Sequence, residues 1–139
     1  QEVCPWNSKA PLSMEKEFAA EDSARTPDLR KLMELDQSGF RKRFKNSPVL
    51  RTKRRGLLRN VAIALGNWGN PHAIPALELG LIDQEPLIRS HSAWGLGQVA
   101  TKKAYEILEN ALTCEEDPQV LEEIREALSA FKEKKDPIL

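Results

Sequence analysis

The chain has 139 residues, of which 21 are Lys or Arg and 21 are Asp or Glu, so its formal net charge is zero. This length and composition favour one soluble globular domain, and no apolar run approaches the roughly 20 residues of a membrane-spanning helix. Its two cysteines, Cys4 and Cys114, lie far apart in sequence, which argues against a disulfide framework and favours a reducing, cytoplasmic location.

Helix signals follow one another along the chain, and no segment has the pattern of a strand or hairpin. The first predicted helix, in TPDLRKLMEL, has Thr26 as its N-cap and Pro27 at its first position. In the second, SGFRKRFKN, Phe40 and Phe44 are four residues apart, so both rings lie on one side of the helix. Further helices are predicted in residues 47–69, 70–80, 86–100, 101–112 and 117–135, most of them opened by a polar cap beside a proline. The sequence therefore predicts an all-α fold.

The later helices repeat at an offset of 31 or 32 residues, as when Ala64-Leu65-Gly66 returns as Gly95-Leu96-Gly97. Paired helices at such a period are typical of a solenoid, in which stacked pairs bury each other's apolar stripes. The stretch DQEPLIRSHSAWGLG resembles the short HEAT-like repeat, and small residues are expected to let its helices approach closely: Ala62, Ala64, Ala93 and Gly95. We expect about two and a half helix pairs in residues 47–139, preceded by a linker and lead-in helices in residues 9–46.

Basic and acidic residues are segregated along the chain. No Asp or Glu occurs from Gln37 to Leu77, whereas the segment after Glu106 is rich in acidic residues. A dense basic segment attracts polyanions, and an acidic end repels them and so orients the molecule. The alternative is a solvated face, or one that pairs with an acidic surface of another domain. We predict nucleic-acid contacts at Arg41, Lys42, Arg43, Arg51, Lys53, Arg54, Arg55, Arg59 and Asn60.

Some polar residues have a structural interpretation that we prefer to a functional one. Arg89 is expected to pair with Asp83, in the turn before its helix, whereas Arg59 has no acidic residue nearby in sequence, which favours RNA. His72 and His91 have no Cys or Asp partner at the spacing of a zinc site, so they are expected to cap helices and pack at the surface.

The aromatic and cysteine residues of the repeats are also interpreted structurally. Trp68 and Trp94 are expected in the core or at repeat edges rather than as platforms on which bases stack. Cys114 is expected to be a small buried residue. No Ser/His/Asp set, glycine-rich phosphate loop or pair of carboxylates indicates catalysis within the chain.

The N-terminal VCPWN is informative because a Cys-Pro pair ends the cysteine run that ligates iron–sulfur clusters in bacterial ferredoxins. By itself, Cys4 is either such a ligand or a buried structural cysteine. Together with the later SPVLRTKRRGLLRNVAIALGN and PLIRSHSAWGLG, however, VCPWN resembles the C-terminal third of the epoxyqueuosine reductase family. In that family a ferredoxin-like part ends in Cys-Pro-Trp-Asn and a HEAT-like tail follows. The match spans nearly the whole chain, and the segment from Arg54 to Asn67 is its most specific part.

The resemblance implies a cobalamin-dependent reductase with [4Fe–4S] clusters, which reduces epoxyqueuosine to queuosine in tRNA. The cobalamin pocket and the catalytic acid of the family lie upstream of the matched part. Residues 1–8 are then the end of a truncated iron–sulfur motif with Cys4 as its metal ligand, and we expect the chain alone to bind no cofactor and to be inactive. Its expected partners are tRNA and the upstream domains of the same polypeptide, without a membrane. Two other hypotheses stay open: a protein-interaction scaffold without nucleic-acid binding, and a structural buttress for catalytic domains.

Overall fold

The computed structural model describes Pro5 and residues 26–135, with side chains to Phe131. The described residues form helices and no strand, which confirms the all-α prediction: α2 (Leu29–Met33), α3 (Gln37–Arg43), α4 (Lys53–Trp68), α5 (Ile74–Leu81), α6 (Pro86–Val99), α7 (Lys102–Cys114) and α8 (Pro118–Lys135). Two short 3-10 turns, η2 (Pro48–Thr52) and η3 (Pro71–Ala73), precede α4 and α5. The described part of the chain contains no helix with the length and apolar character needed to cross a membrane. The predictions for Cys4 and for most of the linker lie outside the described residues.

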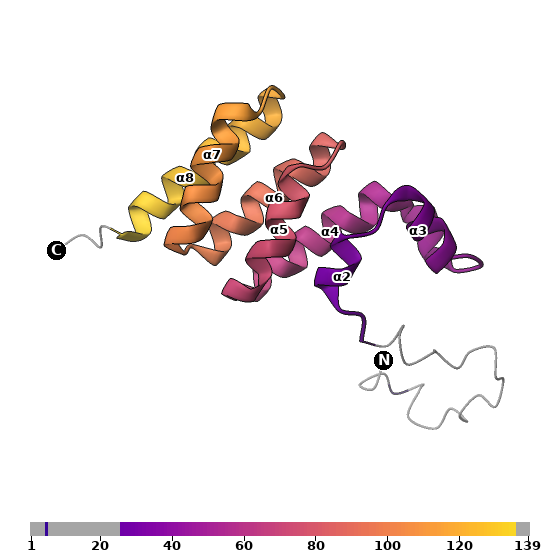
Figure 1. Cartoon of the computed structure of the whole chain (residues 1–139). Helices are drawn as coiled ribbons and strands as arrows, with labels where there is room; N and C mark the ends of the chain where they lie inside the picture. The colour runs from indigo at the N-terminus through magenta and orange to yellow at the C-terminus, as the bar shows by residue number, and fades with distance from the viewer. Residues whose placement is uncertain (1–4, 6–25, 136–139) are drawn as a thin grey trace.

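The helices form two layers (Figure 1). In one layer α6 packs between α4 and α8, and in the other α2, α5 and α7 lie against them. Buried side chains from both layers form one core, which extends from Leu32 in α2 to Leu128 in α8. The expected stack of helix pairs is confirmed: α2 pairs with α4, α5 with α6, and α7 with α8, while α3 and η2 are inserted within the first pair. Part of the segment predicted as a lead-in therefore belongs to the core.

Local residues fix where the helices begin. α2 begins at Leu29 rather than near Thr26, because the Asp28 carboxylate accepts the Arg30 backbone N–H at 3.0 Å and closes the first turn there. Ser47 caps the short η2 turn rather than one long helix, so the helix predicted at residues 47–69 is divided into η2 and α4. The remaining side-chain caps follow the prediction, at Asn70, Thr101 and Asp117.

Glycines bring α4 and α6 into close contact. A Cβ atom on Gly95 would lie 2.8 Å from Leu77 Cδ2 and 3.2 Å from the Ala62 carbonyl oxygen. A Cβ atom on Gly66 would lie 2.8 Å from the Cα of Gly95. The prediction that small residues allow close helix packing is thus confirmed at Gly95, and Ala62 is likewise fully buried.

Candidate nucleic-acid interface

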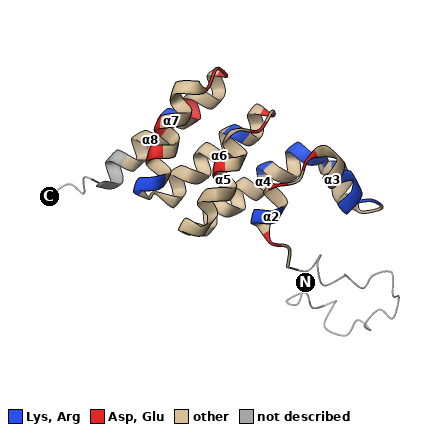
Figure 2. Cartoon of the chain, in the orientation of Figure 1, with Lys and Arg blue, Asp and Glu red and all other residues tan. Residues whose placement is uncertain are grey.

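Four of the predicted RNA-contacting residues line one pocket of about 530 Å³ at the corner between α3 and the start of α4. We call this the basic pocket, and its cations are Arg41, Lys53, Arg54 and Arg55. Figure 2 shows Lys and Arg gathered on α3 and at the start of α4. Among the lining residues, Glu85 supplies the one carboxylate, and it comes from the α5–α6 turn. The sequence prediction did not include Glu85, which is remote in sequence, or the uncharged lining residues Gln37, Phe40 and Leu50.

Helix α3 forms one wall of the basic pocket and is held by a cap at its N-terminus and by a buried ring at its middle. Asp36 caps it by accepting the Gly39 backbone N–H at 2.6 Å. The Phe40 ring is buried, and its centroid lies 5.3 Å from that of Phe44, as expected for two rings four residues apart. Because Phe40 holds the helix against the rest of the protein, the exposed Arg41 beside it is held at the pocket wall.

The other wall depends on an unusual backbone conformation at Lys53. Its φ of 57° and ψ of 164° lie outside the regions that residues with a side chain normally adopt. Holding a residue in such a conformation costs the folded state about 1–3 kcal/mol of free energy. This conformation turns the chain from η2 into α4. Successive residues of a helix point about 100° apart, so Lys53, Arg54 and Arg55 reach the pocket from different sides of the first turn of α4, and Lys53 and Arg55 are exposed there.

Of these three residues, Arg54 points inward and is held by protein groups. Its Nε donates to the Leu35 carbonyl at 2.6 Å, and its Nη1 and Nη2 donate to the two carboxylate oxygens of Asp83. The two side chains are 17% and 10% exposed, so the ion pair is largely screened from water. Burial disfavours the charged form of Asp83, but hydrogen bonds from Arg54 and from the Glu85 N–H hold the pKa of Asp83 below its ordinary value. Arg54 therefore has a structural role, whatever it contributes to RNA binding.

Arg89 repeats this arrangement one helix pair later, with a partner that differs from the predicted one. Its Nε and Nη2 donate to the Glu115 carboxylate at 2.7 and 2.8 Å, whereas Asp83 offers it only a backbone carbonyl, at 2.9 Å. The predicted carboxylate partner was wrong because Asp83 is already bound by Arg54 from the preceding pair. The hydrogen bonds from Arg89 hold the pKa of Glu115 below its ordinary value. Each arginine thus bonds both to the turn of its own helix pair and to the turn of the next one: Arg54 joins Leu35 to Asp83, and Arg89 joins Asp83 to Glu115.

The remaining predicted contacts differ in their surroundings. Arg59 donates from Nε and Nη2 to the Asn60 side-chain oxygen at 3.1 and 2.9 Å, so these two residues form one hydrogen-bonded unit further along α4. The Arg43 guanidinium lies 5.9 Å from the centroid of the Phe44 ring. Lys42 and Arg51 are exposed. Among the described residues, no carboxylate forms an ion pair with any predicted cation other than Arg54.

Other residues interpreted from the sequence take varied positions. Cys114 is exposed rather than buried, because α7 extends beyond the end of α5 and leaves its last turn uncovered. Trp68 is 52% exposed at the end of α4, which is a repeat edge. Trp94 is half-buried and packs beside Gly66. His91 Nδ1 lies 2.9 Å from the Leu87 carbonyl, and His72 is exposed in η3.

Comparisons with known proteins agree with this architecture. Residues 48–129 match the family described as HEAT repeats. An epoxyqueuosine reductase of Xanthomonas campestris pv. campestris is 35% identical over 99 residues, which cover 70% of this chain and 28% of that protein. An epoxyqueuosine reductase of Bacillus subtilis is 28% identical over 133 residues, which cover 95% of this chain and 34% of that protein. The chain thus spans about a third of the length of such relatives.

A solved structure extends the similarity to three dimensions. The crystal structure of an epoxyqueuosine reductase with a tRNA-Tyr epoxyqueuosine-modified tRNA stem loop matches with a TM-score of 0.87 at 26% identity. The match covers 95% of this chain and 36% of that one. The resemblance inferred from the sequence is therefore confirmed in both sequence and fold.

Proposed function

Because the chain belongs to the HEAT-repeat family and resembles epoxyqueuosine reductases along most of its length, we propose that it is the tRNA-contacting part of such an enzyme. The observation that carries this proposal is the basic pocket, which brings cations from two separate helices to one corner of an acid-free segment. The similar structure that contains a tRNA stem loop supports the same partner. The parent enzyme would reduce epoxyqueuosine to queuosine in tRNA.

The chemistry of this interface is recognition of the RNA backbone. Guanidinium and ammonium groups donate hydrogen bonds to phosphate oxygens, and the counterions that they displace make binding favourable and dependent on salt. Arg41, Lys53 and Arg55 are the residues best placed for this, because each is exposed and lines the basic pocket. The Arg59–Asn60 unit adds N–H donors on the same helix, suited to a phosphate or to a base edge.

The cofactors of the parent enzyme belong, in this proposal, to other parts of the polypeptide. Within residues 26–131 no group of three His, Cys, Asp or Glu side chains is arranged to hold a metal ion. Cys4 stays the proposed ligand of a [4Fe–4S] cluster, and cobalamin is proposed to bind upstream.

A salt series tests the proposal. The chain is titrated into a labelled anticodon stem loop of tRNA-Tyr, and fluorescence anisotropy gives the affinity between about 50 and about 200 mM salt. With three to four phosphate contacts, the logarithm of the association constant should fall with the logarithm of salt at a slope of about −3. Absence of binding at the low-salt end, or an affinity that does not change with salt, would overturn RNA contact and favour the protein-interaction scaffold.

A further inference from the structure

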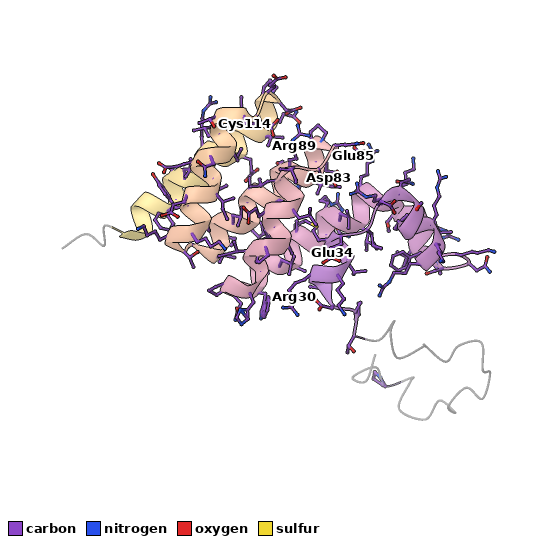
Figure 3. The ribbon with its side chains drawn as sticks, viewed as in Figure 1. Arg30, Glu34, Asp83, Glu85, Arg89 and Cys114 are labelled. Carbon is purple, nitrogen blue, oxygen red and sulfur yellow. The ribbon has the colours of Figure 1, made fainter. Side chains whose placement is uncertain are left out.

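The charge reverses along the edge that carries the basic pocket. On the far side of Arg54 lies a pocket of about 900 Å³ lined by four carboxylates: Glu34, Asp36, Asp83 and Glu85. Beyond it, between α5 and α7, lies a groove of about 560 Å³, which we call the acidic groove. Figure 3 shows Asp83, Arg89 and Cys114 along this edge. Because these two hollows are acidic, the RNA proposed for the basic pocket would be repelled from them.

The acidic groove exists because two neighbouring helices differ in length. Helix α5 ends at Leu81 after 8 residues, whereas α7 runs for 13 residues to Cys114, so the last turns of α7 extend past the end of α5. Leu81, Ile107 and Ala111 line the groove as an apolar floor. At its side stands Ile82, which is 78% exposed and so is the most exposed large hydrophobic residue in the described part of the chain. Ile82 and the apolar floor together offer contact area to an aliphatic side chain of a partner.

The rim of the groove carries an excess of negative charge. Its lining contains four carboxylates, of Glu78, Asp83, Glu115 and Glu116, against the single cation of Arg89. Asp83 and Glu115 are already bound by arginines. Glu78 and Glu116 are exposed and form no ion pair with any described residue, so they are available to an outside cation.

We propose that the acidic groove is a docking site for a short segment of a partner protein that combines basic and aliphatic side chains. Lysine or arginine of the segment would pair with Glu78 and Glu116, and an aliphatic side chain would cover Ile82 and the apolar floor. Charge complementarity selects this occupant, since the two carboxylates without an ion pair, of Glu78 and Glu116, would repel a polyanion and attract a cation. The apolar floor favours an occupant that also carries an aliphatic side chain. The groove is separate from the proposed RNA contacts, so both partners could bind together.

Three labelled peptides of equal length test this inference on the 139-residue chain. One alternates lysine and leucine, one alternates lysine and serine, and one alternates glutamate and leucine. Backbone amide chemical shifts in NMR spectra locate the binding site, and anisotropy measures affinity. The lysine–leucine peptide should bind most tightly and shift amides at residues 78–82 and 107–116. Equal binding of the lysine–serine peptide, or shifts located mainly on α8, would overturn the proposal.

Matched variants separate the groove from general electrostatics. Ile82→Ser should weaken binding of the lysine–leucine peptide about fivefold, because it removes apolar contact, and Glu116→Lys should weaken it about tenfold through local repulsion. Glu122→Lys makes the same charge change at an exposed site on α8, outside the groove, and should have little effect. An equal loss of affinity in Glu116→Lys and Glu122→Lys would overturn the proposal. The chain is also diluted without peptide: if the amide signals of the groove then move, a second copy of the chain occupies the groove, and the proposal is overturned as well.

Discussion

The Arg54 side chain at the start of α4 binds the Asp83 carboxylate, which lies in the turn of the next helix pair. The same side chain donates a hydrogen bond to the Leu35 carbonyl, which lies in the turn of its own helix pair. One residue thereby connects the turn after α2, the start of α4 and the α5–α6 turn. Arg89 makes the equivalent connection to Glu115. These two bridges hold successive turns of the stack in register, and the first of them also fixes the floor of the basic pocket.

Arg54→Gln should destabilise the chain by about 2–3 kcal/mol, because it leaves the Asp83 carboxylate largely buried without its charged donor. Chemical denaturation followed by circular dichroism measures the free energy of unfolding. Arg55→Gln is the matched control, since Arg55 is exposed and adjacent, and it should change that energy by less than about 0.5 kcal/mol. Equal effects of the two substitutions would show that the bridge does not stabilise the stack.

Stability should decrease in acid because of the same bridges. The pKa values of Asp83 and Glu115 lie below their ordinary values in the folded chain, so the unfolded chain binds protons first. The stabilisation that these two carboxylates provide is complete above about pH 4, where both are ionised even in the unfolded chain. It is lost as the pH falls from there through the lower pKa values of the folded chain. Glu123 has the opposite effect on stability in acid: burial raises its pKa, so its protonation as the pH falls favours the folded chain.

Denaturation midpoints measured between about pH 6 and about pH 3 check this expectation. Asp83→Asn should flatten the decrease in stability below about pH 4, whereas Glu78→Gln, at an exposed residue without an ion pair among the described residues, should leave its steepness unchanged. A decrease that is equally steep in wild type and Asp83→Asn would show that Asp83 does not carry it.

The fold could be predicted from the sequence because its signals are local. Helix caps such as Thr101 and Asp117, and the recurring Leu-Gly pairs, are each read within a few residues and fix the helix pairs. The place of α2 in the first pair could not be predicted in this way, since the inserted α3 and η2 separate it from α4.

The candidate site was predicted less completely, because its contacts join distant residues. The density of cations in sequence indicated the basic segment, but Arg54 and Asp83 are 29 residues apart, and no local pattern shows that one arginine of the segment is already bound. For the same reason Arg89 was assigned to Asp83, which is close in sequence, rather than to Glu115, which is 26 residues away. Exposure of Cys114 depends on the difference in length between α5 and α7, which appears only when the helices are stacked.

Two glycines of α4 should respond in opposite ways to substitution by alanine. A Cβ atom on Gly66 would lie 2.7 Å from Trp94 Cζ3 and 2.8 Å from the Gly95 backbone, so Gly66→Ala should destabilise the chain by about 1–3 kcal/mol. A Cβ atom on Gly56 would meet nothing closer than 3.6 Å, so Gly56→Ala should stabilise it by about 0.5–1 kcal/mol through helix propensity. Thermal denaturation of both variants checks the contrast. A neutral Gly66→Ala would mean that α4 and α6 can separate without penalty.

Charge reversal within the basic pocket should weaken RNA binding more than the same change elsewhere. Lys53→Glu and Arg55→Glu each remove a cation from the pocket lining and add a repulsive charge, so each should lower the affinity for the tRNA-Tyr stem loop about tenfold and reduce the salt slope by about one. Arg125→Glu makes an identical change of charge at an exposed position on α8 and serves as the control. Because Lys53 and Arg55 form no ion pair with a described residue, neither substitution should affect stability by more than about 1 kcal/mol. If all three variants lose affinity equally, net charge rather than the pocket attracts the RNA. If none does, the RNA binds to another surface of the chain and the basic pocket does not contact it.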